Sequence, residues 1–600
     1  MQMNKLLKFI YFLILYINYV LSEDFIDSVP IPPYSTTGMI IDGGSGGSRL
    51  HVYNWAPRIF QTLPPTLSYP TTNEFWTQKM SPGIAYMKTS EDVAKHLAPL
   101  IDFAKNVLKG KENEFWMYPI YFKATGGMRE LNLIDREQIM EWTRQHLMNS
   151  TFNPFFFRTD MARVISGIEY IYIYILYLSI YLFILGEEEA IFSWTAINFL
   201  KDTLLPNSAG TGTATSNNTW GTLDLGGASL QIAFYVLSQD ISENLFKLQI
   251  GGQKHWNVYT KSYLSFGHVS ARRRYLAFIS DKAIEFHKYE KDRKANRMIV
   301  FNDMNKISRI LEDFNVSYYT SNNNKTTLTA STHCFPSGYK EKAWGTFKNE
   351  SVYVSGPSYS SDDQFERCVE SMRYLLEKQH SGFCNRVYDH QCGIDGVYQP
   401  TLPSGQSFIG TSSFIYSWEI LLLNDTVSLN YFDSRAKVIC SMSYQEVEKY
   451  FDGKNLELHD DKLSDLIPYF CFLSAYTHVL LEDGFGFTSD QNLTVLDKVN
   501  GNKVGWALGA ILYEINSLPW ELDIQPKHNF AELIIAASVG CIVGAIATFF
   551  LSKELLHSRN SRLPIVLNND DTQEKWELEI KQYSPFQGIK KGYTKIPDKT

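Results

Sequence analysis

Two short segments of this chain share one chemical pattern, in which an apolar run leads to an aspartate, glycines and a hydroxyl side chain. The first segment is Ile40–Ser48 and the second is Thr222–Ser229. Glycine lets backbone N–H groups turn inward, so a loop of this kind can wrap a phosphate. The leading aspartates, Asp42 and Asp224, are oxygen ligands suited to a Ca²⁺ or Mg²⁺ ion held partly through water. Two copies predict a duplicated fold whose loops face one cleft, an arrangement suited to polyphosphates.

Each of these residues, taken singly, also has an ordinary structural explanation. Asp224 is then a plain turn residue, and Glu187–Glu189 is an acidic helix start favoured by the helix dipole. Arg129 is more commonly an ion-pair partner than a ligand, and the aromatic side chains of Phe408, Phe414 and Tyr416 are more simply core residues than base-stacking ones. Only the occurrence of the motifs together favours the functional interpretation.

Alternating strand-like and helix-like segments must position these loops. The strand-like segments are Gly38–Tyr53, Phe115–Lys123 and Thr219–Tyr235, and the helix-like ones are Ser90–Lys109, Asp135–Met148 and Asp363–Gln379. This alternation is typical of an α/β fold. With 600 residues, 44% of them hydrophobic and 20% charged, the chain has room for two or three folded domains. Its net charge of −8 and the lack of a long basic run make a nucleic-acid partner unexpected.

An apolar segment lies near each end of the chain. Leu6–Leu21 indicates either a signal peptide over residues 1–22 or a short signal anchor, and the sequence leaves both open. Residues 533–551 are uncharged and long enough to cross a bilayer, and basic residues follow them. This pattern predicts a transmembrane helix with residues 552–600 in the cytosol, so the bulk of the chain is expected to be lumenal or extracellular.

Sequons and cysteines agree with that compartment. Between the two apolar ends lie the N-x-S/T sequons that begin at Asn149, Asn217, Asn315, Asn324, Asn349, Asn424 and Asn492. Outside residues 533–551, the cysteines are Cys334, Cys368, Cys384, Cys392, Cys440 and Cys471. An even number in an oxidising compartment predicts three disulfides, and the lack of any C-x-x-C pair gives a zinc site little support.

One internal segment does not fit the α/β pattern. Tyr170–Leu185 consists almost wholly of Ile, Tyr and Leu, yet a membrane span here would place the two glycine-rich loops on opposite sides of the membrane. Deleting Ile168–Gly186 joins Gly167 to Glu187 in an uninterrupted helix start. We therefore hypothesise that residues 168–186 derive from a translated intron or a similar gene-model error. A genuine insertion and a third membrane span are the alternatives.

The motifs, in chain order, resemble the apyrase family, the nucleoside triphosphate diphosphohydrolases, whose fold is similar to that of actin, hexokinase and heat-shock ATPases. The matching segments are Asp42–Arg49 with Val52–Trp55, Lys123–Arg129, Gly186–Trp194 with Asn198, Leu223–Gln231, Gly396–Pro400, Phe408–Tyr416 and Gly505–Gly509. This resemblance implies two actin-like (RNase H-like) α/β lobes around a nucleotide cleft. Lobe I would take residues 36–200, lobe II residues 201–490, and residues 491–525 would return to lobe I.

The resemblance also implies a role for each site residue. The phosphate-binding set would be Gly44, Ser45, Gly46, Ser48, Thr125, Gly126, Gly226, Gly227 and Ala228. Glu189 would be the general base for the attacking water, which Ser229 and Gln231 would hold. Tyr416 would stack on the nucleobase. No covalent intermediate is implied.

Details resemble the Golgi and lysosomal branch of the family more than the cell-surface enzymes. These details lie in Ser45–Arg49, Val258–Tyr275 and Trp506–Tyr513, and surface enzymes usually have a cysteine where Ser265 stands. The branch implies UDP or GDP as favoured substrates and a Golgi or endolysosomal lumen, with the plasma membrane facing outside as the alternative. By the same resemblance the disulfides would be Cys334–Cys368, Cys384–Cys392 and Cys440–Cys471.

We therefore expect hydrolysis of nucleoside di- and triphosphates to monophosphates, dependent on Ca²⁺ or Mg²⁺, by a membrane-anchored glycoprotein. The alternatives are a phosphotransferase of the same fold and a non-catalytic, nucleotide-binding membrane glycoprotein. The sequence leaves open the nucleotide preference and the oligomeric state.

Overall fold

The computed structural model describes residues 35–61, 68–165, 169–170, 183–184, 188–204, 218–236, 244–250, 254–294, 317–320, 326–346, 351–376, 392–452, 466–499 and 501–522. The expected N-terminal signal segment, the expected transmembrane helix and residues 552–600 lie outside these ranges, as do most of residues 168–186. Across the ranges just given, no helix combines the length and the apolar character needed to cross a bilayer.

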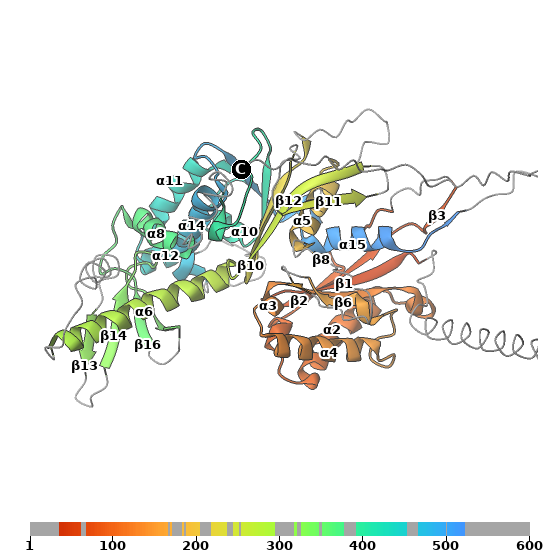
Figure 1. Cartoon of the computed structure of the whole chain (residues 1–600), viewed down its shortest axis with the longest axis horizontal. Coiled ribbons are helices and arrows are strands. Elements are labelled where there is room, and N and C mark those ends of the chain that lie inside the picture. Colours follow the sequence, from red (N-terminus) through yellow and green to blue (C-terminus); the bar gives the residue numbers. More distant parts are fainter. Residues whose placement is uncertain are drawn as a thin grey trace, which may run out of the picture. The chain divides into compact units, whose positions relative to one another are not determined.

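Two mixed β-sheets carry the two glycine-rich loops, and part of the larger sheet repeats the strand order of the smaller one. Figure 1 labels β1 and β2 of the first sheet and β10 and β12 of the second. The five-stranded sheet runs β4 (Thr77–Met80), β2 (Ser48–Asn54), β1 (Thr37–Gly43), β5 (Ile120–Ala124), β6 (Ala162–Val164). The seven-stranded sheet runs β11 (Leu245–Ile250), β12 (Lys254–Leu264), β10 (Ser229–Tyr235), β9 (Gly221–Leu225), β17 (Phe408–Ser412), β19 (Asn492–Val495), β18 (Thr426–Ser428).

The two sheets repeat the same pairing pattern around their loops. β1 and β2 form an antiparallel hairpin, and β5 lies parallel to β1 on its other side. In the second sheet β9 and β10 form the hairpin, and β17 lies parallel to β9. Each hairpin turn is one of the glycine-rich segments, so the repeated topology confirms the predicted duplication within a mixed α/β fold.

Helices α2 (Ser90–Val107) and α4 (Leu133–Met148) cover the first sheet. A capping box starts α2: the Thr89 hydroxyl accepts from the Asp92 N–H at 3.1 Å, and the Asp92 carboxylate accepts from the Thr89 N–H at 3.0 Å. Apolar residues then recur at helical spacing and are buried against β1 and β2 at Val93, Leu97, Leu100, Ile101 and Ala104.

A smaller sheet extends the second half of the chain. It has the order β13 (Ser317–Thr320), β14 (Thr326–Ser331), β16 (Ser351–Ser355), β15 (Lys340–Trp344). The long helix α6 (His268–Lys294) packs on β14, β15 and β16. Helices α8 (Gln364–Met372), α11 (Leu429–Cys440) and α14 (Phe470–Val479) pack against one another. α10 (Phe414–Ile420) contacts α14, and α12 (Tyr444–Phe451) contacts the 3₁₀-helix Ile467–Tyr469.

Helices α5 (Glu188–Leu200) and α15 (Trp506–Ser517) pack closely against each other. α5 also contacts β9, β10 and β12, whereas α15 also contacts β1. A Cβ built at Gly509 of α15 would lie 1.9 Å from the carbonyl oxygen of Phe192 in α5, so only glycine permits this approach. Buried Lys123 of β5 adds an ion pair with Glu514 of α15 at 2.5 Å. These contacts fix the helix that begins with Glu188 and Glu189.

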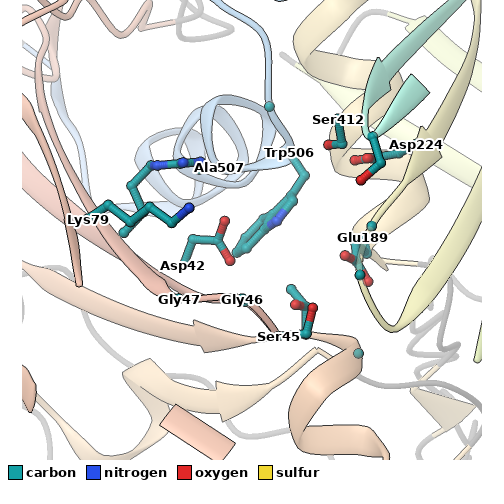
Figure 2. A pocket seen from close by; sticks show the side chains of 18 of the residues that line it. Asp42, Ser45, Gly46, Gly47, Lys79, Glu189, Asp224, Ser412, Trp506 and Ala507 are labelled. Carbon is teal, nitrogen blue, oxygen red and sulfur yellow. The ribbon is translucent and has the colours of Figure 1, made fainter. Parts of the chain in front are cut away.

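The turns of the two hairpins, together with the start of α5 and of α15, line one pocket (Figure 2). Figure 2 shows Asp42 and Lys79 on one side and Glu189, Asp224 and Ser412 on the other. The predicted loops therefore share a cavity.

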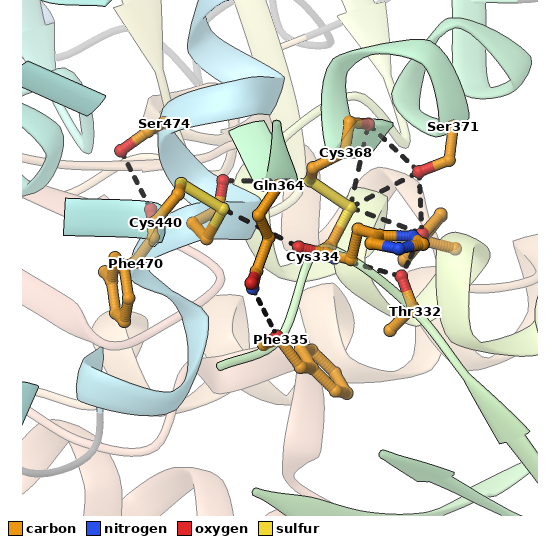
Figure 3. The surroundings of a disulfide bond; sticks show 12 residues. Thr332, Cys334, Phe335, Gln364, Cys368, Ser371, Cys440, Phe470 and Ser474 are labelled. Carbon is orange, nitrogen blue, oxygen red and sulfur yellow. Dashed lines mark hydrogen bonds between the residues drawn. A yellow bond between two sulfur atoms is a disulfide. The ribbon is translucent and has the colours of Figure 1, made fainter. Parts of the chain in front are cut away.

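Two of the three expected disulfides are present among the described residues: Cys334–Cys368 and Cys440–Cys471 (Figure 3). The first joins the segment after β14 to α8, and the second joins α11 to α14. Cys392 is also disulfide-bonded, while its expected partner Cys384 lies outside the described ranges.

Local structure differs from the sequence prediction in one place that matters for the first sheet. The strand expected over 115–123 begins only at Ile120, because Glu112–Met117 forms a 3₁₀-helix. Phe115 is buried against Phe155, with ring centroids 4.8 Å apart. This apolar side chain therefore packs between the 3₁₀-helix and a loop and is not part of a strand.

Candidate functional site

The pocket has a volume of about 1790 Å³ and is lined by both glycine-rich loops. The loops approach each other so closely that a Cβ built at Gly227 would lie 2.5 Å from the Ser45 hydroxyl oxygen. A larger side chain at position 227 would therefore have to displace the Ser45 hydroxyl of the other loop. A ligand held by one loop is within reach of the other.

Each hairpin places its aspartate on the strand that leads into the loop. Asp42 lies in β1 opposite Arg49, and Asp224 lies in β9 opposite Gln231. The pKa of Asp42 is raised from 3.8 to about 7, mainly by burial. Arg49 and Lys79 lower this pKa, and the nearby Asp224 carboxylate raises it. Burial also raises the pKa of Asp224, although the hydroxyls of Ser412, Ser193 and Thr411 oppose this shift.

Glu189 lies in the first turn of α5 and its side chain is buried. Its Oε2 atom lies 2.7 Å from Arg129 Nη2 and accepts from Gln231 Nε2 at 3.0 Å. The pKa of Glu189 is raised from 4.5 to about 7, and burial is the largest cause. Arg129 lowers this pKa, whereas Asp224 and Asp42 raise it. Asp42, Asp224 and Glu189 are thus close enough to influence one another, and all three carboxyl groups are driven toward the neutral form.

Ser229 and Gln231 lie beside Glu189, as predicted. Gln231 Nε2 donates to the Ser229 hydroxyl at 2.8 Å and to the Ser262 hydroxyl at 3.0 Å. Arg129 donates to the same two hydroxyls, each at 3.1 Å. Among the described residues, Gln231 Oε1 is buried and has no hydrogen-bond partner. This carbonyl oxygen can accept one hydrogen bond from a bound water.

The predicted phosphate-binding residues lie at the pocket, with one exception. The pocket lining includes Gly44, Ser45, Gly46, Thr125, Gly126, Gly226, Gly227 and Ala228. Ser48 is absent from it. Ser48 begins β2 and is fully buried, and its hydroxyl bonds to His96 of α2 at 2.8 Å. The strand alternation turns this side chain toward the helix layer, which the sequence motif alone did not reveal.

Tyr416 lines the pocket from α10, where it is partly exposed. Its ring makes an edge contact with His268, with the centroids 5.8 Å apart and the planes at 82°. Phe408 and Phe414 are buried core residues, in agreement with the structural interpretation of these aromatics. Of these three aromatic residues, Tyr416 is therefore the one that lines the pocket.

Sequence reasoning missed two residues of the site and the partner of a third. Ser262 of β12 lies opposite Gln231 in the strand register and accepts from both Gln231 and Arg129. Lys79 of β4 lies beside Asp42 in Figure 2, and a Cβ built at Gly47 would lie 3.0 Å from its Cε. Arg129 was identified as an ion-pair partner, which is confirmed, but its partner is the proposed base itself.

The carboxylates fit a divalent cation held partly through water. Asp42 Oδ1 is buried and has no hydrogen-bond partner among the described residues. Within the same residues no group of three or more His, Cys, Asp and Glu side chains could hold a metal directly. Two aspartates that leave most positions to water and phosphate oxygens match the usual coordination of Mg²⁺.

Comparisons with known proteins found relatives of this chain. The chain is 25% identical over 512 residues to the Golgi apyrase of Saccharomyces cerevisiae, covering 79% of this chain and 69% of that protein. It is 26% identical over 529 residues to ectonucleoside triphosphate diphosphohydrolase 4 of Mus musculus, covering 81% and 74%. A crystal structure of nucleoside triphosphate hydrolases from Neospora caninum aligns with a TM-score of 0.44 and 13% identity, covering 80% of this chain and 92% of that chain.

The profile of the GDA1/CD39 (nucleoside phosphatase) family matches residues 34–182 and 179–527, and therefore most of the chain. Both glycine-rich loops and Glu189 fall inside the match. The resemblance inferred from the motifs is confirmed. The chain belongs to the GDA1/CD39 family and is a nucleoside phosphatase.

Proposed function

We propose that this enzyme hydrolyses nucleoside di- and triphosphates to monophosphates and phosphate, with water activated by Glu189 and with a divalent cation, Ca²⁺ or Mg²⁺. The observation that carries the proposal is the meeting of three carboxyl groups in one pocket between two glycine-rich loops. Hydrolysis of a phosphoanhydride needs charge neutralisation, an in-line water and a base for its proton. The pocket offers groups suited to each requirement.

The two loops would hold the phosphate chain. Backbone N–H groups of Gly44–Gly46 and Gly226–Ala228, with the hydroxyls of Ser45 and Thr125, are donors suited to phosphate oxygens. Lys79, beside the first loop, adds positive charge. These groups bind the ground state and neutralise charge that develops on the leaving oxygen.

Glu189 would accept the proton of the attacking water. A base with a pKa of about 7 is matched to catalysis near neutral pH. Gln231 Oε1 and the Ser229 hydroxyl would hold the water, whose oxygen forms the new bond to the terminal phosphorus as the bond to the bridging oxygen breaks. Arg129 keeps the Glu189 carboxylate oriented during this step.

Asp42 and Asp224 would hold the divalent cation, partly through water. When bound, such an ion neutralises charge on the phosphate oxygens. Both aspartates lie in a pocket that raises their pKa, so positive charge supplied from outside the chain would favour their ionised forms.

For substrate and compartment, we propose UDP or GDP in the lumen of the Golgi or of an endolysosomal compartment. The similarity to a protein named Golgi apyrase supports this proposal, as do the two disulfides, which are typical of oxidising compartments. Membrane anchoring through residues 533–551, with or without an N-terminal anchor, and glycosylation at the sequons belong to the same proposal.

A phosphate-release assay over a panel of nucleotides, with and without a chelator, tests the proposal. It should use the full chain and a chain that lacks residues 168–186. We expect phosphate release from UDP and GDP that the chelator abolishes and that added Ca²⁺ or Mg²⁺ restores. Release that is unaffected by the chelator would exclude the cation, and transfer of phosphate to an added acceptor in place of water would favour the phosphotransferase alternative.

A further inference from the structure

Glu130 directly follows Arg129 and caps the short helix α3 (Gly126–Arg129), next to the first phosphate-binding region. Its carboxylate contacts the other half of the pocket. Oε1 accepts from the Ser270 hydroxyl at 2.5 Å and from the Ser265 hydroxyl at 3.4 Å, and Oε2 lies 2.7 Å from Arg273 Nη2. The Glu130 side chain is only 19% exposed, so these contacts are partly shielded from water.

Of the residues that Glu130 contacts, Ser265 lies in the turn after β12, and Ser270 and Arg273 lie at the start of α6. Residues 265–270, which comprise this turn and the first residues of α6 and are called the turn below, hold the second glycine-rich loop. The backbone N–H of Ser265 donates to the Ala228 carbonyl at 2.8 Å, and that of Ser270 donates to the Gly227 carbonyl at 3.1 Å. The N–H of His268 donates to the Gly226 carbonyl at 3.0 Å. All three loop carbonyls are therefore bound by the turn.

Hydrogen bonds to these carbonyl oxygens favour the binding of an anion by the loop. A carbonyl oxygen that faces a phosphate repels it, whereas an N–H group attracts it. By binding the carbonyls of residues 226–228, the turn over residues 265–270 fixes the peptide planes that such a site needs. The same turn contains Ser265 at φ of 67°, a left-handed conformation that costs free energy in a non-glycine residue and needs support from its surroundings.

We propose that Glu130 is a positioning residue for nucleotide hydrolysis, which holds the turn over residues 265–270 and through it orients the second phosphate-binding loop. This inference rests on the proposed function of the loop. Arg129 and Glu130 are consecutive, so α3 orients the proposed base with one side chain and the second loop with the next.

The two serine contacts matter more for this role than the ion pair with arginine. Arg273 is 62% exposed, and exposed ion pairs contribute little to stability. Ser270, by contrast, is buried, and its hydroxyl donates to a charged acceptor. Variants at positions 130 and 273 should therefore differ in their effects.

Steady-state kinetics of the full chain with UDP, together with hydrogen exchange of the backbone amides over residues 265–270, test the inference. In Glu130→Ala we expect kcat/KM to fall about tenfold, mainly through kcat, because small displacements of binding groups slow the reaction. The amides of Ser265, His268 and Ser270 should exchange faster in this variant, whether or not nucleotide is present.

Three further variants separate positioning from a general structural role. Glu130→Gln keeps an acceptor for both serine hydroxyls and should recover kcat/KM to within about threefold of the unmodified chain, whereas Arg273→Ala should stay within about twofold. Glu91→Ala removes an exposed glutamate of α2 whose ion pair with Lys95 is local, and it should change neither readout.

Equal kcat and equal exchange in Glu130→Ala and the unmodified chain would overturn the inference. A loss of activity in Glu130→Ala with unchanged amide exchange over residues 265–270 would also overturn it, because Glu130 would then not act on activity by holding this turn. If the unmodified chain hydrolyses no nucleotide, the proposed function fails, while the exchange measurement still decides whether Glu130 holds the turn.

Discussion

Arg129 Nη2 lies 2.7 Å from Glu189 Oε2, and this ion pair joins α3 of the first sheet region to α5. The same guanidinium donates to the hydroxyls of Ser229 and Ser262 from the second sheet. The Arg129 side chain therefore connects the proposed base to Ser229, which is proposed to hold the attacking water, and to Ser262. Because all of these groups are buried or half-buried, replacing one changes the charge balance of the rest.

Glu189→Gln should retain nucleotide binding and lose turnover. The amide keeps the shape of the carboxylate but cannot accept a proton, and loss of a general base slows reactions by about 10²–10⁴-fold. Phosphate release and equilibrium binding of a non-hydrolysable nucleotide should be measured on the same preparation. Turnover close to that of the unmodified chain would show that another group is the base.

The decrease in the hydrolysis rate at low pH, the acid limb of the pH–rate profile, should reflect protonation of Glu189. Its pKa is raised to about 7, so the ionised, active form is lost as the pH falls below that value. Arg129→Met removes a charge that lowers this pKa, and the limb should therefore move to higher pH. Arg158→Met, which breaks an exposed ion pair with Asp160, is the matched control and should leave the limb in place.

Asp42 should make the cation-free enzyme less stable at neutral than at acidic pH. Its pKa is about 7 in the folded chain and 3.8 ordinarily, so its contribution to stability is present below pH 4 and is lost as the pH rises through 7. Asp42→Asn should stabilise the cation-free enzyme at pH 7.5 on the order of a few kcal/mol. It should also reduce the rise in Tm on addition of Ca²⁺ or Mg²⁺, which thermal denaturation measures.

A chain without residues 168–186 should fold and hydrolyse nucleotide. The two ends of this segment lie together, because Arg163 forms an ion pair with Glu188 and the short strands β7 (Glu169–Tyr170) and β8 (Phe183–Ile184) pair with each other. The two parts of the family match also meet here, at residues 179–182. We expect the shortened chain to be at least as active as the full one.

Sequencing the cDNA across this junction tests the origin of the segment directly. A transcript that always retains the codons for residues 168–186 would contradict the intron hypothesis. A shortened chain that fails to fold would favour a genuine insertion.

Tyr416→Ala should weaken recognition of the base and spare the phosphate chemistry. Stacking of a base on an aromatic ring contributes about 1–3 kcal/mol, so KM for UDP should rise roughly tenfold or more with little change in kcat. Hydrolysis of inorganic pyrophosphate, which lacks a base, is the control and should be unaffected. A parallel loss with both substrates would place Tyr416 in a structural role.

The local parts of the site were predictable, because short motifs determine them. A glycine-rich turn between two strands is a local pattern, and both hairpins, with Asp42 and Asp224 on their leading strands, were found in this way. The acidic start of α5 was found similarly, and Glu189 lies there. The capping box of α2 also follows from neighbouring residues.

The remaining contacts depend on register and on packing between distant segments. Ser262 joins the site because β12 pairs with β10 so that it lies opposite Gln231, and nothing near Ser262 in the sequence indicates this. Ser48 was assigned to phosphate because the motif does not reveal that its side chain faces His96. The sheet formed by β13–β16 has short strands, and their pairing is likewise not local.

The glycine-mediated contact between Gly509 and Phe192 has a consequence for biosynthesis. A ribosome releases residues 37–264, with both hairpins and Glu189, long before it releases residues 506–517. Until that late helix docks, the helix bearing Glu189 lacks its contacts with α15, so we expect that the proposed catalytic groups are not yet held in place. We therefore expect hydrolysis to begin only after residues 506–517 have been synthesised and have packed on α5.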